Sequence, residues 1–224
     1  MVTPEVLLFD LDGTLIDSES AICESASVAF GEMGIQVAPE SILPHLGAPL
    51  DELYALFASQ LPRDRCASFV ELYIQAHDAH PEANPPALPG VVASLREMRS
   101  RWDIPMAVAT TKPSDRARIQ LEAIGLIDYF EHVQGTDIGM KPKPAPDVIH
   151  AALAQLDRKA NERVYMVGDT KRDVSSARAA GVVPVAVCYR PQNRAAVDAF
   201  GAEFVVADFH ELYRRFLDSA DGLE

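Results

Sequence analysis

Residues 8–15 read Leu8-Phe9-Asp10-Leu11-Asp12-Gly13-Thr14-Leu15, an apolar run that ends in two carboxylates and a glycine. Comparable apolar runs recur along the chain, separated by helix-like sequence, at Ile104 to Ala109, Val164 to Val167, Val182 to Val187 and Phe204 to Ala207. Strands that are apolar without polar alternation need cover on both faces, as in a parallel sheet. The alternation therefore predicts an α/β fold whose core is a doubly wound, Rossmann-like parallel sheet.

One long interruption separates the first predicted strand from the helix expected to begin near Gly90. This interval has no strand-like run, but it has helix-like sequence at 18–33, 49–60 and 64–79 and a shorter turn at 39–45. Its prolines fall between these segments or at their starts, where proline is tolerated. We expect a core domain made of 1–16 and 89–224, with a small α-helical cap domain, 17–88, inserted into it.

Composition limits the partners of the chain. Its 224 residues include 33 acidic and 20 basic side chains, a formal net charge of −13. This balance argues against nucleic acid or an anionic membrane as a partner. The run Val6 to Phe9 is too short for an export signal or a membrane span, and three widely spaced cysteines suit a reducing compartment. We expect a cytoplasmic protein, monomeric or homodimeric, that binds a small molecule.

Asp10 and Asp12 are the first candidate functional residues. Carboxylates at i and i+2 leaving a strand point to the same side, and ligands of parallel sheets bind beyond the carboxyl ends of the strands. One carboxylate can act as a nucleophile while the other handles a proton, and Gly13 permits a sharp turn beside a bound group. The alternative is an aspartate that caps a helix and an ordinary Asp-Gly turn.

The stretch Asp10 to Thr14, DLDGT, resembles the first motif of the haloacid dehalogenase-like (HAD) hydrolases. Three further motifs of that family follow in order: Thr110 after an apolar run, a lysine followed by proline, and an acidic pair, Asp169 and Asp173. The lysine motif fits twice, in Lys141-Pro142-Lys143-Pro144. Spacing to the following helix favours Lys143, with Lys141 in reserve. Four motifs in order at strand ends identify the chain as a member of this family.

The resemblance implies a Mg²⁺ cofactor. Its ligands would be Asp10, Asp169 and the backbone carbonyl of Asp12, with Asp173 supporting the site from outside the ligand set. Taken alone, Asp169 could equally cap the helix that follows it.

The resemblance also implies phosphoryl transfer in two steps. Asp10 would attack phosphorus and form an aspartyl-phosphate, and Asp12 would protonate the leaving alcohol and then serve as the base for water. Thr110 and the motif lysine would hold the phosphate oxygens. Dehalogenation is disfavoured because that branch of the family lacks the second aspartate of the first motif.

The position of the predicted cap resembles that of the phosphoglycolate phosphatase and β-phosphoglucomutase group. Its loop 46–50 looks like the substrate loop of that group, which makes Gly47 a substrate-binding candidate. Glu19, just beyond the first hinge, and Thr111, beside Thr110, are the other two. Caps of this kind open and close over the site and exclude water.

The charge of the cap narrows the substrate. Residues 17–88 contain eleven acids and only Arg63 and Arg65, hence a net charge of −9, and they contain no lysine. The missing lysine excludes the Schiff-base chemistry of phosphonoacetaldehyde hydrolase, a relative. A sugar-phosphate mutase would need a cap cation for its second phosphate, and residues 47–49 offer none. The carboxylate of phosphoglycolate also needs a cation nearby. Arg63, Arg65 or a core arginine such as Arg116 or Arg190 could supply it.

These residues lead to one hypothesis and three alternatives. The hypothesis is a Mg²⁺-dependent phosphatase for a small phosphorylated metabolite whose leaving group is neutral, polyhydroxylated or cationic. Phosphoglycolate phosphatase proper and a mutase of the β-phosphoglucomutase type are the alternatives. A non-catalytic binding protein on this scaffold has the least support, since all four motifs are intact and clustered carboxylates are costly without a metal.

Overall fold

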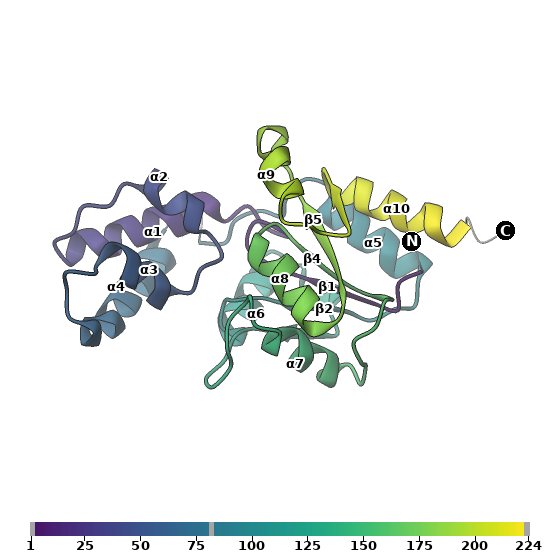
Figure 1. The fold of residues 1–224 in the computed structure, drawn as a ribbon, viewed down its shortest axis with the longest axis horizontal. Coiled ribbons are helices and arrows are strands. Elements are labelled where there is room, and N and C mark those ends of the chain that lie inside the picture. Colours follow the sequence, from purple (N-terminus) through teal and green to yellow (C-terminus); the bar gives the residue numbers. More distant parts are fainter. Residues whose placement is uncertain (1–2, 81–82, 222–224) are drawn as a thin grey trace. The chain divides into compact units, whose positions relative to one another are not determined.

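The computed structural model describes residues 3–80 and 83–221 (Figure 1). Contacts divide the chain into two compact units. The core unit comprises 1–16 and 87–224, and the helical unit comprises 17–86. The sequence places the second boundary at 88/89.

The core unit contains a six-stranded parallel sheet in the order β3-β2-β1-β4-β5-β6. This is the strand order of a doubly wound fold, so the predicted fold class is confirmed. The edge strand β3 has no counterpart among the predicted strands. The strands are β1 (Val6–Phe9), β2 (Met106–Ala109), β3 (His132–Gln134), β4 (Val164–Gly168), β5 (Val183–Val187) and β6 (Phe204–Val206).

Helices cover both faces of the sheet, which is why its strands are apolar throughout. Leu7 and Phe9 of β1 join one buried cluster with α5 and α10, whereas Val6 and Leu8 join another with α7 and α8 (Figure 1). The core helices are α5 (Val91–Arg101), α6 (Ser114–Ala123), α7 (Asp147–Gln155), α8 (Lys171–Ala180), α9 (Arg194–Asp198) and α10 (Phe209–Asp221), with short 3₁₀ turns at Ile127–Tyr129 and Pro191–Asn193.

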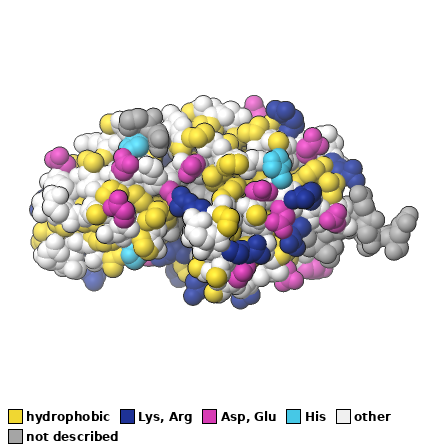
Figure 2. Space-filling model, turned by 90° about the horizontal axis from the view of Figure 1, so that it is seen from above, with side chains coloured by type: hydrophobic (Ala, Val, Ile, Leu, Met, Phe, Trp, Pro, Cys, Tyr) yellow, Lys and Arg dark blue, Asp and Glu magenta, His cyan; other side chains and the backbone are white. Residues whose placement is uncertain are grey.

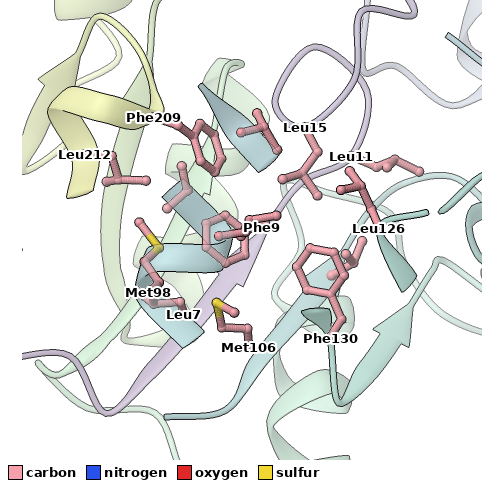
Figure 3. Packing of buried hydrophobic residues seen from close by; sticks show 14 of the residues in the cluster. Leu7, Phe9, Leu11, Leu15, Met98, Met106, Leu126, Phe130, Phe209 and Leu212 are labelled. Carbon is pink, nitrogen blue, oxygen red and sulfur yellow. The ribbon is translucent and has the colours of Figure 1, made fainter. Parts of the chain in front are cut away.

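Aromatic packing fixes β1 in the centre of the first cluster. The Phe9 ring centroid lies 5.7 Å from that of Phe209 and 6.0 Å from that of Phe130, and Figure 3 shows these rings among buried aliphatic side chains. Burying one such ring contributes roughly 1.5–3 kcal/mol. The strand that carries Asp10 at its end is therefore held rigidly.

The helical unit has an apolar core of its own, in which Phe30 stacks on Phe69 with ring centroids 4.4 Å apart. The helices predicted at 18–33, 49–60 and 64–79 are observed as α1, α3 and α4. The elements of this unit are α1 (Glu19–Glu32), α2 (Pro39–Ile42), α3 (Leu50–Phe57) and α4 (Cys66–Ala79), with 3₁₀ turns at Leu43–His45 and Arg63–Arg65.

The surface mixes side-chain types. On the face shown in Figure 2, acidic and basic side chains are interspersed among apolar and other polar ones. None of the helices within 3–80 and 83–221 combines the length and the apolar character needed to cross a membrane. The three cysteines are free thiols; Cys23 and Cys188 are buried and Cys66 is half-buried.

Candidate active site

Three predicted site residues lie at the carboxyl ends of neighbouring strands. Asp10 follows β1, Thr110 follows β2 and Asp169 follows β4, and β1 lies between the other two strands. The Asp10 N–H donates to the Val167 carbonyl at 2.9 Å, and the Thr110 N–H donates to the Gln134 carbonyl at 3.0 Å. The sheet ladder therefore brings these side chains to one edge, as the strand-end pattern predicts.

Asp10, Asp169 and Asp173 form an acidic cluster. One oxygen from each carboxylate lies within 4.8 Å of the other two. Asp173 stands in the first turn of α8, where it forms a capping box with Thr170: the Thr170 N–H donates to its Oδ2 at 3.0 Å. The predicted outer partner Asp173 thus lies within the cluster itself.

Lys143 is buried between two of these carboxylates. Its Nζ lies 2.7 Å from Asp10 Oδ1 and 2.5 Å from Asp173 Oδ1, and it also donates to the Ala109 carbonyl at 3.2 Å. Burial alone would lower the pKa of Lys143, but the charges of Asp10 and Asp173 hold it above its ordinary value. Lys141 is exposed, and its backbone N–H donates to Asp147. Of the two candidate lysines, Lys143 is the one at the cluster.

The cluster carries more negative charge than Lys143 can offset. Burial, followed by the charge of Asp173, raises the pKa of Asp10 to about 6 even though Lys143 opposes the shift. Burial also raises the pKa of Asp169 well above its ordinary value, and the negative charges of Asp173 and Asp10 add to this shift. Three carboxylates and one ammonium leave a charge of −2, which a divalent cation would neutralise. An all-oxygen donor set suits a hard cation, so the cluster is consistent with a divalent metal site.

Gly13 and Thr14 set the position of Asp169. Gly13 has φ +76°, and a Cβ atom there would lie 2.5 Å from Asp169 Oδ2, so only glycine fits without displacement. The Thr14 hydroxyl donates to Asp169 Oδ1 at 2.8 Å. The Tyr189 hydroxyl donates in turn to the Thr14 carbonyl at 2.9 Å. The loop after β1 therefore contacts the residue that follows β4 directly.

Asp12 is paired with Lys112, a residue to which the sequence pattern assigned no role. The Lys112 Nζ lies 2.8 Å from Asp12 Oδ1 and donates to Gln120 Oε1 at 2.5 Å. The carboxylate of Asp12 is not among the three that converge. One signal was available in the sequence: Lys112 directly follows Thr110-Thr111 and is the first lysine of the chain.

The remaining predicted residues are placed as follows. Thr110 is buried, and its Oγ1 accepts the Lys112 N–H at 3.4 Å; Thr111 is half-buried beside it. Glu19 begins α1, and Gly47 follows the Leu43–His45 turn with φ +80°. Glu19 and Gly47 belong to the helical unit. The substrate-binding roles of Glu19, Gly47 and Thr111 stay predictions.

Comparison with known proteins shows the family of the chain. The family model of the haloacid dehalogenase-like hydrolases matches residues 7–187, so the chain belongs to that family. Within the family it falls into the subfamily of phosphoglycolate phosphatase and PpaX, and it is a HAD-like phosphatase that acts on a small phosphorylated substrate.

Individual relatives support this placement. The chain is 33% identical over 218 residues to a phosphoglycolate phosphatase of Rhodospirillum rubrum, covering 93% of this chain and 89% of the relative. It is 28% identical over 206 residues to the pyrophosphatase PpaX of Oceanobacillus iheyensis, covering 92% and 94%. The crystal structure of a predicted phosphatase from Clostridium acetobutylicum matches with a TM-score of 0.85 and 25% identity, covering 97% of this chain and 100% of that chain.

Proposed function

We propose that the protein is a Mg²⁺-dependent phosphomonoesterase that works through an aspartyl-phosphate on Asp10. The observation that carries this proposal is the division of the carboxylates. Asp10 lies in a cluster that a cation would neutralise, whereas the carboxylate of Asp12 is not part of that cluster and pairs with Lys112. One carboxylate can therefore serve as the nucleophile while the other exchanges protons.

In the first step, an Asp10 oxygen forms a bond to phosphorus and the bond from phosphorus to the substrate oxygen breaks. The leaving oxygen keeps that electron pair and takes a proton from Asp12, which releases the alcohol. In the second step, a water oxygen attacks phosphorus and gives its proton to Asp12. The bond between phosphorus and Asp10 breaks, which restores the Asp10 carboxylate and releases inorganic phosphate.

The phosphate is held by groups that surround Asp10. Lys143 supplies a buried positive charge next to the nucleophile, and Thr110, at the end of β2, offers a hydroxyl at the same edge of the sheet. Asp10, Asp169 and Asp173 would hold Mg²⁺, with the Asp12 carbonyl as a further ligand. The bound ion supplies charge neutralisation for the phosphoryl oxygens. Positioning and charge stabilisation account for most of the catalysis of such transfers.

Two candidate substrate classes remain. The net charge of −9 on residues 17–88 favours a leaving group that is neutral, polyhydroxylated or cationic. The Rhodospirillum rubrum relative favours phosphoglycolate instead. A phosphate-release screen over sugar phosphates, amino-alcohol phosphates, nucleotides, pyrophosphate and phosphoglycolate separates the two. A tenfold or greater preference in kcat/KM for phosphoglycolate would refute the charge argument.

The nucleophile is tested with Asp10→Asn. We expect this variant to fold and to bind Mg²⁺ more weakly, with Mg²⁺-dependent phosphate release reduced at least about 10⁴-fold, since covalent catalysis needs the carboxylate. Asp103→Asn, which alters an exposed aspartate before β2, is the matched control and should retain full activity. Turnover by Asp10→Asn close to that of the control would disprove the mechanism.

A further inference from the structure

Asp12 follows Asp10 by two residues, yet its side chain has a different environment. Its Oδ1 lies 2.8 Å from the Lys112 Nζ, while the cluster of Asp10, Asp169 and Asp173 contains Lys143 as its cation. The side chains of Asp12 and Lys112 are 20% and 13% exposed, so the pair lies at the rim of the site rather than on the open surface.

Lys112 is itself anchored to the core. Its Nζ donates to Oε1 of Gln120, a buried residue of α6, at 2.5 Å. Its backbone N–H donates to Thr110 Oγ1 at 3.4 Å. Helix α6 is fixed in turn because Ala117 and Leu121 belong to the main buried cluster. A free lysine side chain samples many rotamers, whereas this one is restrained at both ends.

We propose that Lys112 is a positioning residue that holds Asp12 as the proton acceptor for hydrolysis of the aspartyl-phosphate. The inference rests on the proposed function. In that step the water proton passes to Asp12 as the water oxygen bonds to phosphorus, and the breaking bond returns its electron pair to Asp10. Lys112 neither gains nor loses a bond. Without it, Asp12 would lose its cation beside three other acids, and its carboxylate would move away from the attacking water.

A substrate with a good leaving group isolates this effect. p-Nitrophenolate departs without a proton, so formation of the aspartyl-phosphate from p-nitrophenyl phosphate does not need Asp12, whereas its hydrolysis does. The ratio kcat/KM reports only the steps through the first irreversible one, and kcat includes the hydrolysis. A residue that acts solely through Asp12 as a base should therefore change kcat and leave kcat/KM nearly unchanged.

For Lys112→Met, we expect kcat for p-nitrophenyl phosphate to fall roughly 10- to 100-fold, because small displacements of a catalytic group have effects of this size. We expect kcat/KM to stay within about threefold of the wild type. Rapid mixing should show a burst of about one p-nitrophenolate per site, and acid-quenched protein should carry phosphate on Asp10.

Further variants separate positioning from structure. Lys112→Arg keeps the charge and should recover most of kcat, and Gln120→Leu, which removes the anchor, should show a smaller loss with a smaller burst. Lys159→Met removes an exposed lysine after α7 and is the matched control. If Lys112→Met does not fold, the same measurements of kcat and burst are made on Lys112→Arg and Gln120→Leu. Unchanged kcat and no burst in Gln120→Leu would then overturn the proposal.

The remaining outcomes are equally decisive. A parallel fall in kcat and kcat/KM would overturn the proposal, because Lys112 would then contact the phosphate or support the fold. An unchanged kcat in Lys112→Met would overturn it as well. Failure of the proposed function is distinguishable from these results. In that case the wild type would release no phosphate in the presence of Mg²⁺, or Asp10→Asn would remain active, whatever the Lys112 variants do.

Discussion

Replacing Lys143 by methionine should destabilise the core unit strongly in metal-free buffer. Methionine matches the length of the lysine stem but removes the only cation whose Nζ lies 2.7 Å from Asp10 and 2.5 Å from Asp173 among the described residues. Breaking a buried ion pair by removing one partner costs about 3–5 kcal/mol. The two contacts share one ammonium group, so this cost is counted once.

Protonation of Asp10 limits the loss of stability in Lys143→Met. The pKa of Asp10 is already raised to about 6 by burial, and removal of Lys143 raises it further, so the carboxyl takes up a proton near neutral pH. We therefore expect a loss of about 3 kcal/mol at pH 7.5. The folded variant binds a proton that the unfolded chain does not bind between pH 4 and 7. Its stability therefore falls as pH rises, and the difference from the wild type should shrink towards pH 5.

The measurement is urea unfolding followed by fluorescence in the presence of a chelator. Trp102 is the single tryptophan and lies in the core unit against Tyr213 and Phe216, so its emission reports this unit separately from the helical one. Lys141→Met is the matched control, because that side chain is exposed, and its stability should stay within about 0.5 kcal/mol of the wild type. If the free energy of unfolding fell by less than about 1 kcal/mol in Lys143→Met, or by an equal amount in Lys141→Met, the buried ion pairs of Lys143 would not stabilise the core unit as argued.

Two further predictions concern the neighbours of Lys143. Gly13→Ala places a Cβ 2.5 Å from Asp169 Oδ2, so we expect the affinity for Mg²⁺ to fall about tenfold or more in a thermal-shift titration. Gly125→Ala is the control, because Gly125 has φ +71° and open space around it. This control should lose only the free energy of backbone strain, about 1–3 kcal/mol, and should bind Mg²⁺ like the wild type. In metal-free buffer, the stability of Asp10→Asn relative to the wild type should rise between pH 4 and 6 and then level off, because the raised pKa of Asp10 penalises its ionised form. A flat or falling difference over that pH range in urea titrations would contradict the assignment of that pKa.

The sequence predicts most of the sheet because five strands are continuous apolar runs buried on both faces. Strand β3 escapes this pattern, since His132–Gln134 is short and has polar residues at both ends. It lies at the edge of the sheet and pairs only with β2, so it does not need to be apolar on both sides. Helix positions in the inserted segment follow from its proline spacing and apolar pattern, and its boundary with the core moves by only two residues.

The site is predictable where a residue ends a strand and not where a contact spans the chain. Asp10, Thr110 and Asp169 follow directly from strand ends. Spacing to the following helix favours Lys143 over Lys141, but the burial of Lys143 and the pairing of Lys112 with Asp12, which are 100 residues apart, are seen only in the structure. Neither burial nor such a long-range contact leaves a local pattern in a single sequence.

The two chain crossings between the units are paired. Ile16 and Ala87 form an antiparallel bridge, and the Leu88 N–H donates to the Leu15 carbonyl at 2.9 Å. An insertion whose ends meet adds little loop-closure entropy to the domain that holds it. Residues 17–86 can therefore be exchanged for another module, or for a short turn, without re-threading the sheet. The inserted unit can thus change in evolution while the strands that carry Asp10, Thr110 and Asp169 stay the same.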